Sequence, residues 1–205
     1  MTLSEKQKES LDTTVTSFQG HVNVAGPYLQ GRGLTPEHAR VFRLGVVPSD
    51  VPGFEQYAGR LSIPYLTPTG VVDIRFRALG QQEPKYMSRT GVQGHMYNVS
   101  AFQTSGDIIA ICEGEFDAMS ATALAGIPTI GIPGANGWKP LWHRAFLDYT
   151  TVLVLCDGDE AGRDFGKRVR KDVENATVIH LSEGEDVNSI VVKQGPEALR
   201  ARVGL

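Results

Sequence analysis

From Asp107 onward, short apolar runs alternate with mixed polar stretches of helical length. Four runs are rich in Ile, Val and Leu and fit buried strands: 108–112, 127–132, 151–156 and 177–181. Helices are predicted between and after these strands, over 117–125, 140–148, 160–174, 187–193 and 196–203. This alternation predicts an α/β fold with a parallel sheet and flanking crossover helices.

The part of the chain before residue 105 has a different pattern. Two strands are expected over 61–66 and 71–79, joined by a turn at 67–70. In the second strand, Ile74 and Phe76 alternate with charged residues, which predicts one apolar and one polar face. A small helical unit over 28–42 contains Thr35 as a predicted N-cap. This half therefore reads as a smaller mixed α+β subdomain.

These patterns divide the chain into three parts. Residues 1–26 are polar and show no convincing period, so we expect a mobile segment or a short adaptor. Residues 27–104 form the mixed subdomain, and residues 105–205 form the parallel α/β domain, with a boundary near residues 100–106.

Charge is distributed unevenly over the 205 residues, whose net charge is −3. Residues 1–104 carry 10 basic and 8 acidic side chains, whereas residues 105–205 carry 10 and 15. This asymmetry has two readings, ordinary surface variation or an acidic metal-binding half beside a slightly basic half that holds a polyanion. Cys112 and Cys156 are the only cysteines, which fits a reducing cytoplasm and provides no zinc-ligand pair. No apolar run approaches the ~18 residues of a membrane span.

Carboxylates follow the predicted strands where those strands end. Glu113 and Asp117 follow the first strand, and Asp157 and Asp159 follow the third. In an open parallel sheet, ligands bind at the carboxyl ends of the strands. Because clustered carboxylates repel one another, they are brought together mainly where a cation neutralises them. The set therefore predicts a divalent-metal site, although Asp117 taken alone is better explained as an N-cap or a solvated charge.

Asp186 follows the fourth strand and would reach the same sheet edge. A helix N-cap and a metal ligand are equally good readings of this residue. The stretch from Asp157 begins like an EF-hand loop, but Ala161 and Arg168 occupy positions that need oxygen ligands. The Gly-rich loop over 131–139 lacks the spacing of a Walker phosphate loop.

Basic residues of the first half have two readings. Arg75 and Arg77 on one strand face are typical of edge-strand charges that prevent aggregation, which is the preferred interpretation of the pattern alone. The other reading is a phosphate-contacting patch that also includes Arg60, Lys85 and Arg89.

Several of these segments resemble a known family. Glu113-Gly114-Glu115-Phe116-Asp117, with Asp157-Gly158-Asp159-Glu160-Ala161-Gly162-Arg163, resembles the Toprim domain of bacterial-type primases, type IA and II topoisomerases and certain nucleases. Segments earlier in the chain, and one after the last strand, are similar to the catalytic core of DnaG-type primases: 28–34, 42–45, 60–64, Arg77, 85–88, 97–98 and 183–195. The resemblance covers about residues 27–203, and the earlier segments select primase among Toprim proteins.

The resemblance implies an enzyme that joins ribonucleotides on a single-stranded DNA template with Mg²⁺ or Mn²⁺ and without zinc. Glu113 would align or deprotonate the attacking hydroxyl, while Asp157 and Asp159 would hold the metals, supported by Asp117 and Asp186. Arg60, Arg77 and Lys85 match basic positions for template and nucleotide, which reverses the preferred reading of Arg77 and leaves Arg75 as a surface charge. Asn188 stands where the family usually has an acid.

The resemblance also sets expectations for partners. The family's zinc-binding and helicase-binding domains have no counterpart in this sequence, as in compact phage-encoded primases. A replicative helicase or a separate zinc-binding chain is then the expected protein partner, in the cytoplasm of the host. Two alternatives stay open: a Toprim nuclease or topoisomerase-like subunit, and an inactive accessory protein that binds single-stranded DNA.

Overall fold

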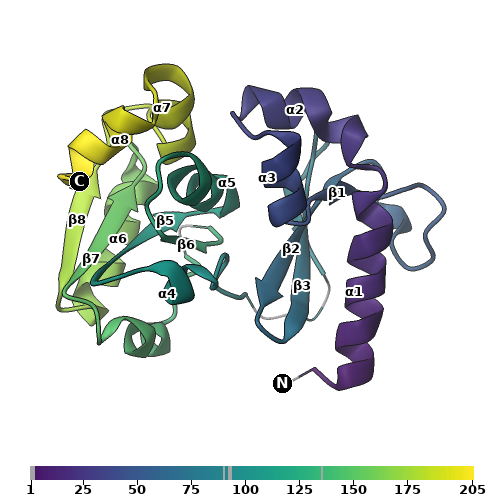
Figure 1. Cartoon of the computed structure of the whole chain (residues 1–205), viewed down its shortest axis with the longest axis horizontal. Coiled ribbons are helices and arrows are strands. Elements are labelled where there is room, and N and C mark those ends of the chain that lie inside the picture. Colours follow the sequence, from purple (N-terminus) through teal and green to yellow (C-terminus); the bar gives the residue numbers. More distant parts are fainter. Residues whose placement is uncertain (1–2, 90, 92–93, 135) are drawn as a thin grey trace. The chain divides into compact units, whose positions relative to one another are not determined.

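The computed structural model of the chain describes residues 3–89, 91, 94–134 and 136–205. It divides into two compact units, residues 1–93 and 94–205, each built around its own four-stranded sheet (Figure 1). Residues 1–2 of the predicted N-terminal segment and Ala135 of the Gly-rich loop lie outside the described residues.

An antiparallel sheet forms the centre of the first unit, in the order β1-β2-β3-β4. Its strands are β1 (Gly45–Val46), β2 (Leu61–Thr67), β3 (Gly70–Arg77) and β4 (Tyr86–Ser88). The helical elements are α1 (Glu5–Gln19), η1 (Val22–Ala25), α2 (Gly26–Gly31), α3 (Pro36–Val41) and η2 (Glu55–Tyr57). The predicted hairpin between β2 and β3 is present, and Thr35 caps α3 by accepting a hydrogen bond from the His38 backbone N–H.

The N-terminal segment differs from its expected form. Residues 5–19 form the regular helix α1, which begins at a capping box between Ser4 and Gln7. Leu11, Val15 and Phe18 lie one helical turn apart on one face, and all three are buried against the core of this unit. Three apolar residues at this spacing suffice to dock an otherwise polar helix, so the expectation of a mobile segment was wrong, while the alternative of a short adaptor stays a prediction.

β3 is an inner strand of the sheet, so reading its charges as edge-strand charges was also wrong. The apolar side of the predicted alternation is confirmed, because Ile74 and Phe76 are fully buried. The charged side is covered as well: Asp73 is 6% exposed and Arg77 is 6% exposed. Arg75 is half-buried, and its guanidinium lies 4.6 Å from the Tyr86 ring centre.

As predicted, a parallel sheet forms the centre of the second unit. Its strand order, β6-β5-β7-β8, comes from the structure. The strands are β5 (Ile108–Glu113), β6 (Thr129–Ile132), β7 (Thr151–Cys156) and β8 (Ala176–His180). The helical elements are α4 (Ala101–Thr104), α5 (Glu115–Met119), η3 (Ser120–Leu124), η4 (Pro140–Phe146), α6 (Glu160–Asp172), α7 (Val187–Gln194) and α8 (Pro196–Val203).

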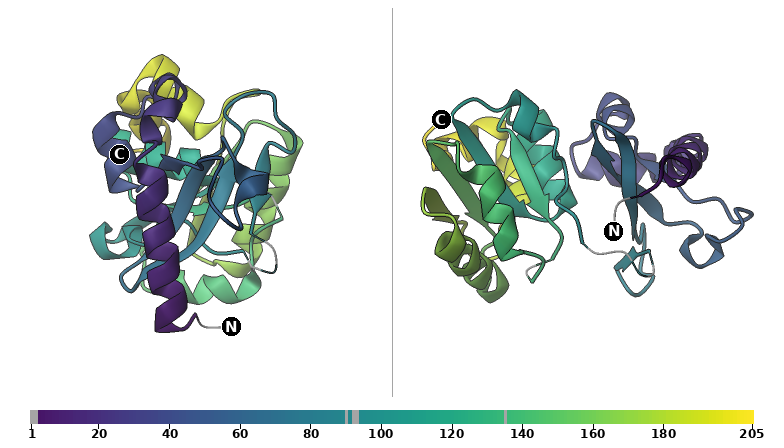
Figure 2. Two further views of the ribbon diagram at one scale, coloured as in Figure 1. Left: turned by 90° about the vertical axis from the view of Figure 1, so that its right-hand side faces the viewer. Right: turned by 90° about the horizontal axis from the view of Figure 1, so that it is seen from below.

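Helices cover both faces of this sheet (Figure 2). One face packs against α6 and η4, with Phe146, Phe165 and Val169 in its core. The other face lies under α5, and α7 and α8 pack around α5 and η3. Because both faces are covered, residues 108–112 of β5 and 152–156 of β7 are all apolar, and Cys112 and Cys156 are buried near the strand ends.

The boundary between the units lies between residues 93 and 94, several residues before the expected one. Residues 97–98 belong to the second unit because Tyr97 exchanges two backbone hydrogen bonds with Gly131, and the Asn98 side chain donates to the Thr129 carbonyl. Within the described ranges, no helix has both the length and the apolar character needed to cross a membrane.

Candidate active site

The turn after β7 carries Asp157 and Asp159, and its geometry depends on Gly158. The Gly158 backbone N–H donates to the Glu185 carbonyl at 2.9 Å, and its carbonyl accepts from the Gly184 N–H at 3.3 Å. A Cβ atom at position 158 would lie 1.7 Å from the Ser182 carbonyl oxygen. Only glycine permits this approach, so the residue locks the turn after β7 to the loop after β8.

Asp159 also begins the following helix. Its Oδ1 accepts the Gly162 backbone N–H at 2.7 Å, which makes Asp159 the N-cap of α6. A Cβ atom at position 162 would lie 2.2 Å from the Asp157 carbonyl oxygen, so the helix can start this close to the strand end only with glycine there. The Asp-Gly-Asp-Glu-Ala-Gly motif thus encodes a tight strand-to-helix turn that presents two carboxylates.

The end of β5 places Glu113 and Asp117 near this turn. Glu113 is the last residue of β5, and Asp117 is on the short helix α5 that follows. Asp117 is 9% exposed, and its Oδ1 accepts the Asn188 backbone N–H at 2.8 Å. The sequence position of Asn188 suggested a missing metal ligand. Its side chain is instead buried and donates to Ser120 Oγ at 2.7 Å, so Asn188 fastens the first turn of α7 to α5 and η3.

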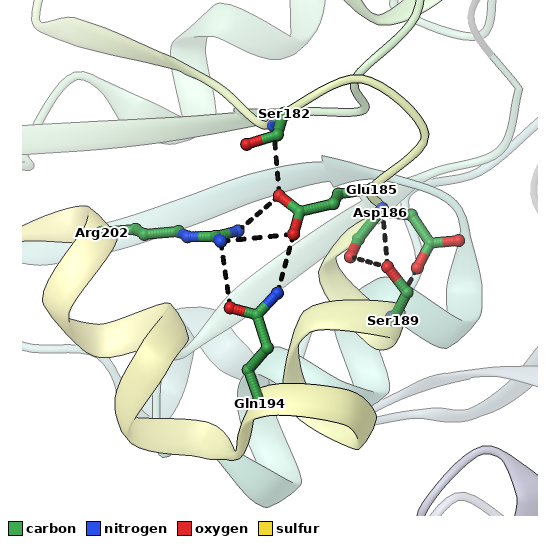
Figure 3. A network of polar contacts seen from close by, with 6 residues as sticks. All are labelled: Ser182, Glu185, Asp186, Ser189, Gln194 and Arg202. Atoms are coloured by element: carbon green, nitrogen blue, oxygen red, sulfur yellow. Dashed lines mark hydrogen bonds and ion pairs between the residues drawn. The ribbon is translucent and has the colours of Figure 1, made fainter.

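Asp186 is the N-cap of α7, in a capping box with Ser189 (Figure 3). Its Oδ1 accepts the Ser189 backbone N–H at 2.6 Å, and Ser189 Oγ accepts the Asp186 backbone N–H at 3.0 Å. Capping uses Oδ1 and leaves Oδ2 uninvolved in that bond. The two readings of Asp186, N-cap and metal ligand, are therefore compatible.

Asp157 lies within electrostatic reach of the other four predicted acids. Burial, and after it the charges of Asp117, Glu113, Asp186 and Asp159, together raise the pKa of Asp157 to about 8. Burial and the charge of Asp159 raise the pKa of Glu113 to about 7. The structure thus brings together carboxylates from the ends of β5, β7 and β8.

Two carboxylate oxygens at this edge are buried without a hydrogen-bond partner among the described residues, Glu113 Oε1 and Asp157 Oδ1. Such atoms are costly unless a cation or another donor reaches them. Hard oxygen donors with excess negative charge suit Mg²⁺ or Mn²⁺. Within the described ranges, no three His, Cys, Asp or Glu side chains converge as a ready metal cluster. Mg²⁺ does not require one, because it is usually held by one or two carboxylates together with water and phosphate oxygens.

The predicted basic residues lie in the first unit. Arg60 is 5% exposed and donates to the Pro84 carbonyl at 2.7 Å and the Glu83 carbonyl at 3.4 Å. Arg77 donates to the Tyr86 hydroxyl at 2.5 Å, and its guanidinium lies 5.2 Å from the Tyr28 ring centre. Lys85 is exposed in the loop that Arg60 holds. Arg60 and Arg77 thus serve the packing of this unit, and Lys85 presents its charge to solvent.

Sequence reasoning missed four residues whose side chains bond to the segments that carry the acids: Ser120, Glu185, Gln194 and Arg202. The acid-rich segment 182–188 indicated a loop at the sheet edge. It did not indicate that Arg202, 17 residues after Glu185, would bind it, because that pairing depends on how α8 folds back along α7.

Comparisons with known proteins agree with this geometry. Residues 108–197 match the Toprim domain model. The Gene 57 protein of Mycobacterium phage D29 is 45% identical over 152 residues, which cover 72% of this chain and 99% of that protein. A DNA primase of Pseudomonas aeruginosa is 26% identical over 226 residues, covering 86% of this chain. The chain spans about a third of that primase, since the match covers 33% of its length.

Solved structures show the same fold. The RNA polymerase domain of Mycobacterium tuberculosis primase DnaG aligns with a TM-score of 0.82 and 21% identity, covering 98% of this chain and 84% of that one. A DnaG primase catalytic domain bound to ssDNA aligns with a TM-score of 0.77 and 21% identity, covering 96% and 77%. The chain therefore belongs to the same family as the phage Gene 57 protein, matches the Toprim domain model over residues 108–197 and has the fold of DnaG-type primase catalytic cores.

Proposed function

We propose that this protein synthesises short RNA primers on single-stranded DNA by nucleotidyl transfer in DNA replication. The observation that carries the proposal is that the charges of four other carboxylates act on Asp157 at the carboxyl edge of the parallel sheet, where two buried carboxylate oxygens have no hydrogen-bond partner among the described residues. The kinship with DNA primases supports a polymerising reaction over other Toprim chemistries. The likeness to a phage protein supports a phage origin.

Each acid has a proposed role. Divalent magnesium or manganese, when bound, would neutralise the nucleoside triphosphate and stabilise the attacking and leaving oxygens. Asp157 and Asp159 would hold the ions, with Asp117 and Asp186 in support. Glu113 would orient the attacking hydroxyl and accept its proton. A raised pKa of about 7 suits Glu113 to that task, because a general base works best when its pKa lies near the operating pH.

The first unit is proposed to contribute contacts with DNA. Lys85 would contact a phosphate of the template, while Arg60 and Arg77 would support that surface by holding the loop at Glu83–Pro84 and the Tyr86 ring. The DnaG catalytic domain that is bound to ssDNA supports single-stranded DNA as the template. A replicative helicase or a separate zinc-binding chain is the proposed protein partner, and the host cytoplasm is the proposed location.

A primer-synthesis assay tests the proposal. Labelled ribonucleotides are supplied with single-stranded DNA and Mg²⁺ or Mn²⁺, and RNA products are separated by length. We expect the wild type to make RNA and Asp159→Ala to make at least ~100-fold less, because the substitution removes a proposed ion ligand. Asp164→Ala is the matched control, since Asp164 lies on α6, the helix that Asp159 caps, and forms an ion pair with Lys167. It should retain wild-type activity.

The same assay separates the alternatives. Wild-type protein that binds DNA but makes no RNA would refute the proposal and favour an inactive DNA-binding protein. Cleavage of the template would instead favour a Toprim nuclease or a topoisomerase-like subunit.

A further inference from the structure

Three side chains form a closed triangle at the C-terminal end of the second unit (Figure 3). Arg202 donates two hydrogen bonds to the Glu185 carboxylate, at 2.7 and 3.3 Å. Gln194 Nε2 donates to Glu185 Oε1 at 2.7 Å, and Gln194 Oε1 accepts from Arg202 at 3.1 Å. We call these three residues the Glu185 clamp. A bidentate pair closed by a third residue has a defined geometry that an isolated surface ion pair lacks.

The clamp joins three segments that are separate in sequence. Glu185 is in the loop between β8 and α7, Gln194 is the last residue of α7, and Arg202 is on α8. The Glu185 carboxylate also accepts the Ser182 backbone N–H at 3.3 Å, which closes the loop on itself. The Arg202 side chain is 31% exposed and that of Glu185 is 21% exposed, so the clamp lies at the surface and its closed geometry, not exclusion of water, distinguishes it from a simple ion pair.

The other side of the same loop holds the acids. The Glu185 carbonyl accepts the Gly158 N–H, and Gly158 lies between Asp157 and Asp159. Asp186 directly follows Glu185 in sequence, and Asn188, in the next turn, donates to Asp117. Thus the Glu185 side chain bonds to Gln194 and Arg202, while the Glu185 backbone bonds to the turn that carries Asp157 and Asp159.

We propose that Arg202 is a positioning residue for the divalent ion. Acting through Glu185 and Gln194, it holds the Ser182–Asp186 loop so that Asp157, Asp159 and Asp186 form the ion-binding arrangement. The inference rests on the proposed function, since it concerns the ion that the same acids would hold.

The direction of the effect distinguishes positioning from simple electrostatics. Removing a positive charge near a cluster of carboxylates should, through Coulomb interaction alone, strengthen cation binding. Loss of a residue that positions ligands should weaken it, and changes behind a metal site typically reduce metal affinity by about 10- to 100-fold. The two mechanisms therefore predict opposite signs for one substitution.

Mn²⁺ binding to the full chain, measured by electron paramagnetic resonance of the free ion, tests the proposal without relying on activity. Arg202→Ala should bind Mn²⁺ about tenfold more weakly than the wild type, and Arg202→Lys should fall between the two, because lysine keeps the charge but cannot form the bidentate pair. Asp157→Asn removes a proposed ion ligand, so the Mn²⁺ binding that this variant loses relative to the wild type is the binding at the proposed site. The double variant Glu185→Ala/Arg202→Ala should bind as Glu185→Ala does, because Arg202 acts through Glu185.

Arg200→Ala is the matched control. Arg200 is on the same helix and carries the same charge, but it binds the Ala125 carbonyl and Glu197. It should leave Mn²⁺ affinity within about twofold of the wild type. Circular dichroism establishes folding, and if Arg202→Ala does not fold, Arg202→Lys and Arg202→Gln provide the comparison.

Each outcome bears on the inference. Unchanged or tighter Mn²⁺ binding by the folded Arg202 variants would overturn it and leave the proposed function intact. Wild-type binding that Asp157→Asn does not weaken would overturn both. If Arg202→Ala binds Mn²⁺ more weakly and the wild type makes no RNA, the positioning role is supported and primer synthesis is refuted.

Discussion

At the scale of single residues, the site consists of carboxylates that repel one another electrostatically. Asp157 is surrounded by four other acids, and both its pKa and that of Glu113 are raised. In the absence of an ion, the folded state therefore holds protons that the unfolded state would release. Bringing these carboxylates together therefore lowers the free energy of unfolding of the metal-free protein, by an amount that depends on pH.

The free energy of unfolding in a chelating buffer is expected to fall as pH rises from about 5 to about 8. The folded pKa values of Asp157 (about 8) and Glu113 (about 7) lie above their ordinary values, so the folded state binds more protons across this window. Each such proton changes the free energy of unfolding by at most ~1.4 kcal/mol per pH unit. Asp73, with a pKa of about 6 caused by burial, acts in the same direction. Urea denaturation at several pH values measures the slope.

Asp157→Asn is the control for that prediction. The amide cannot ionise, so the variant should show a shallower slope and, at about pH 8 without metal, exceed the wild type in stability by roughly 1 kcal/mol. At about pH 5 the two proteins should be nearly equal. A variant less stable than the wild type at pH ~8 would contradict the assigned charge repulsion.

At the scale of elements, backbone contacts between loops decide where the acids lie. The turn after β7 and the loop after β8 touch at Gly158, and α5 touches α7 through Asp117 and Asn188. The contact at Gly158 leaves no room even for a Cβ atom. The α7–α8 pair supports them from behind through the Glu185 clamp.

Gly158→Ala should destabilise the second unit by about 1–3 kcal/mol, because the new methyl group overlaps the Ser182 carbonyl and forces the two loops apart. Mn²⁺ binding should weaken together with stability. Gly106→Ala makes the same chemical change in the same unit, at a position with no atom within 4 Å of the new Cβ. Thermal unfolding of both variants measures the difference, and equal unfolding temperatures would show that the two loops separate without cost.

Helix α1 is expected to contribute strongly to the stability of the first unit. Phe18 is fully buried, and its ring lies edge-on to Phe54 with ring centres 5.3 Å apart. Phe18→Ala should lower the free energy of unfolding by about 3–5 kcal/mol through lost burial and an unfilled cavity. Glu9→Ala, on the exposed side of the same helix, should change it by less than ~0.5 kcal/mol. Urea unfolding followed by circular dichroism makes the comparison.

At the scale of the whole molecule, the chain contains two units with separate sheets and separate cores. All five acids belong to residues 94–205, and the proposed DNA-contacting residues belong to residues 1–93. The proposed chemistry at the metal and the proposed recognition of template thus belong to different units.

Residues 94–205 alone are expected to fold, because the parallel sheet is covered on both faces by its own helices. The fragment should bind Mn²⁺ within about threefold of the full chain, since every proposed ligand and the Glu185 clamp are retained. It should not make RNA on single-stranded DNA. A fragment that unfolds, or that makes RNA as well as the full chain does, would contradict this division.

Particular residues show how far the sequence could predict the site. Asp157 and Asp159 were recognisable because they follow an apolar run directly, and the order of strands and helices placed Glu113 at the same sheet edge. The role of Asn188 was not recognisable, since its contacts with Asp117 and Ser120 span about 70 residues of sequence. Helix α1 was missed because only three apolar residues define its buried face.

The sequence by itself determined the parallel α/β fold, the antiparallel hairpin before it and the identity of the acids, because hydrophobic periodicity and glycine-dependent turns are local properties. Only the tertiary structure decided that Arg77 is buried on an inner strand, that Asp186 and Asp159 cap helices, and that Arg202 binds Glu185. Those facts depend on which distant segments pack together. Packing is set by the whole chain, because a residue's burial and its charge partners exist only once the elements meet.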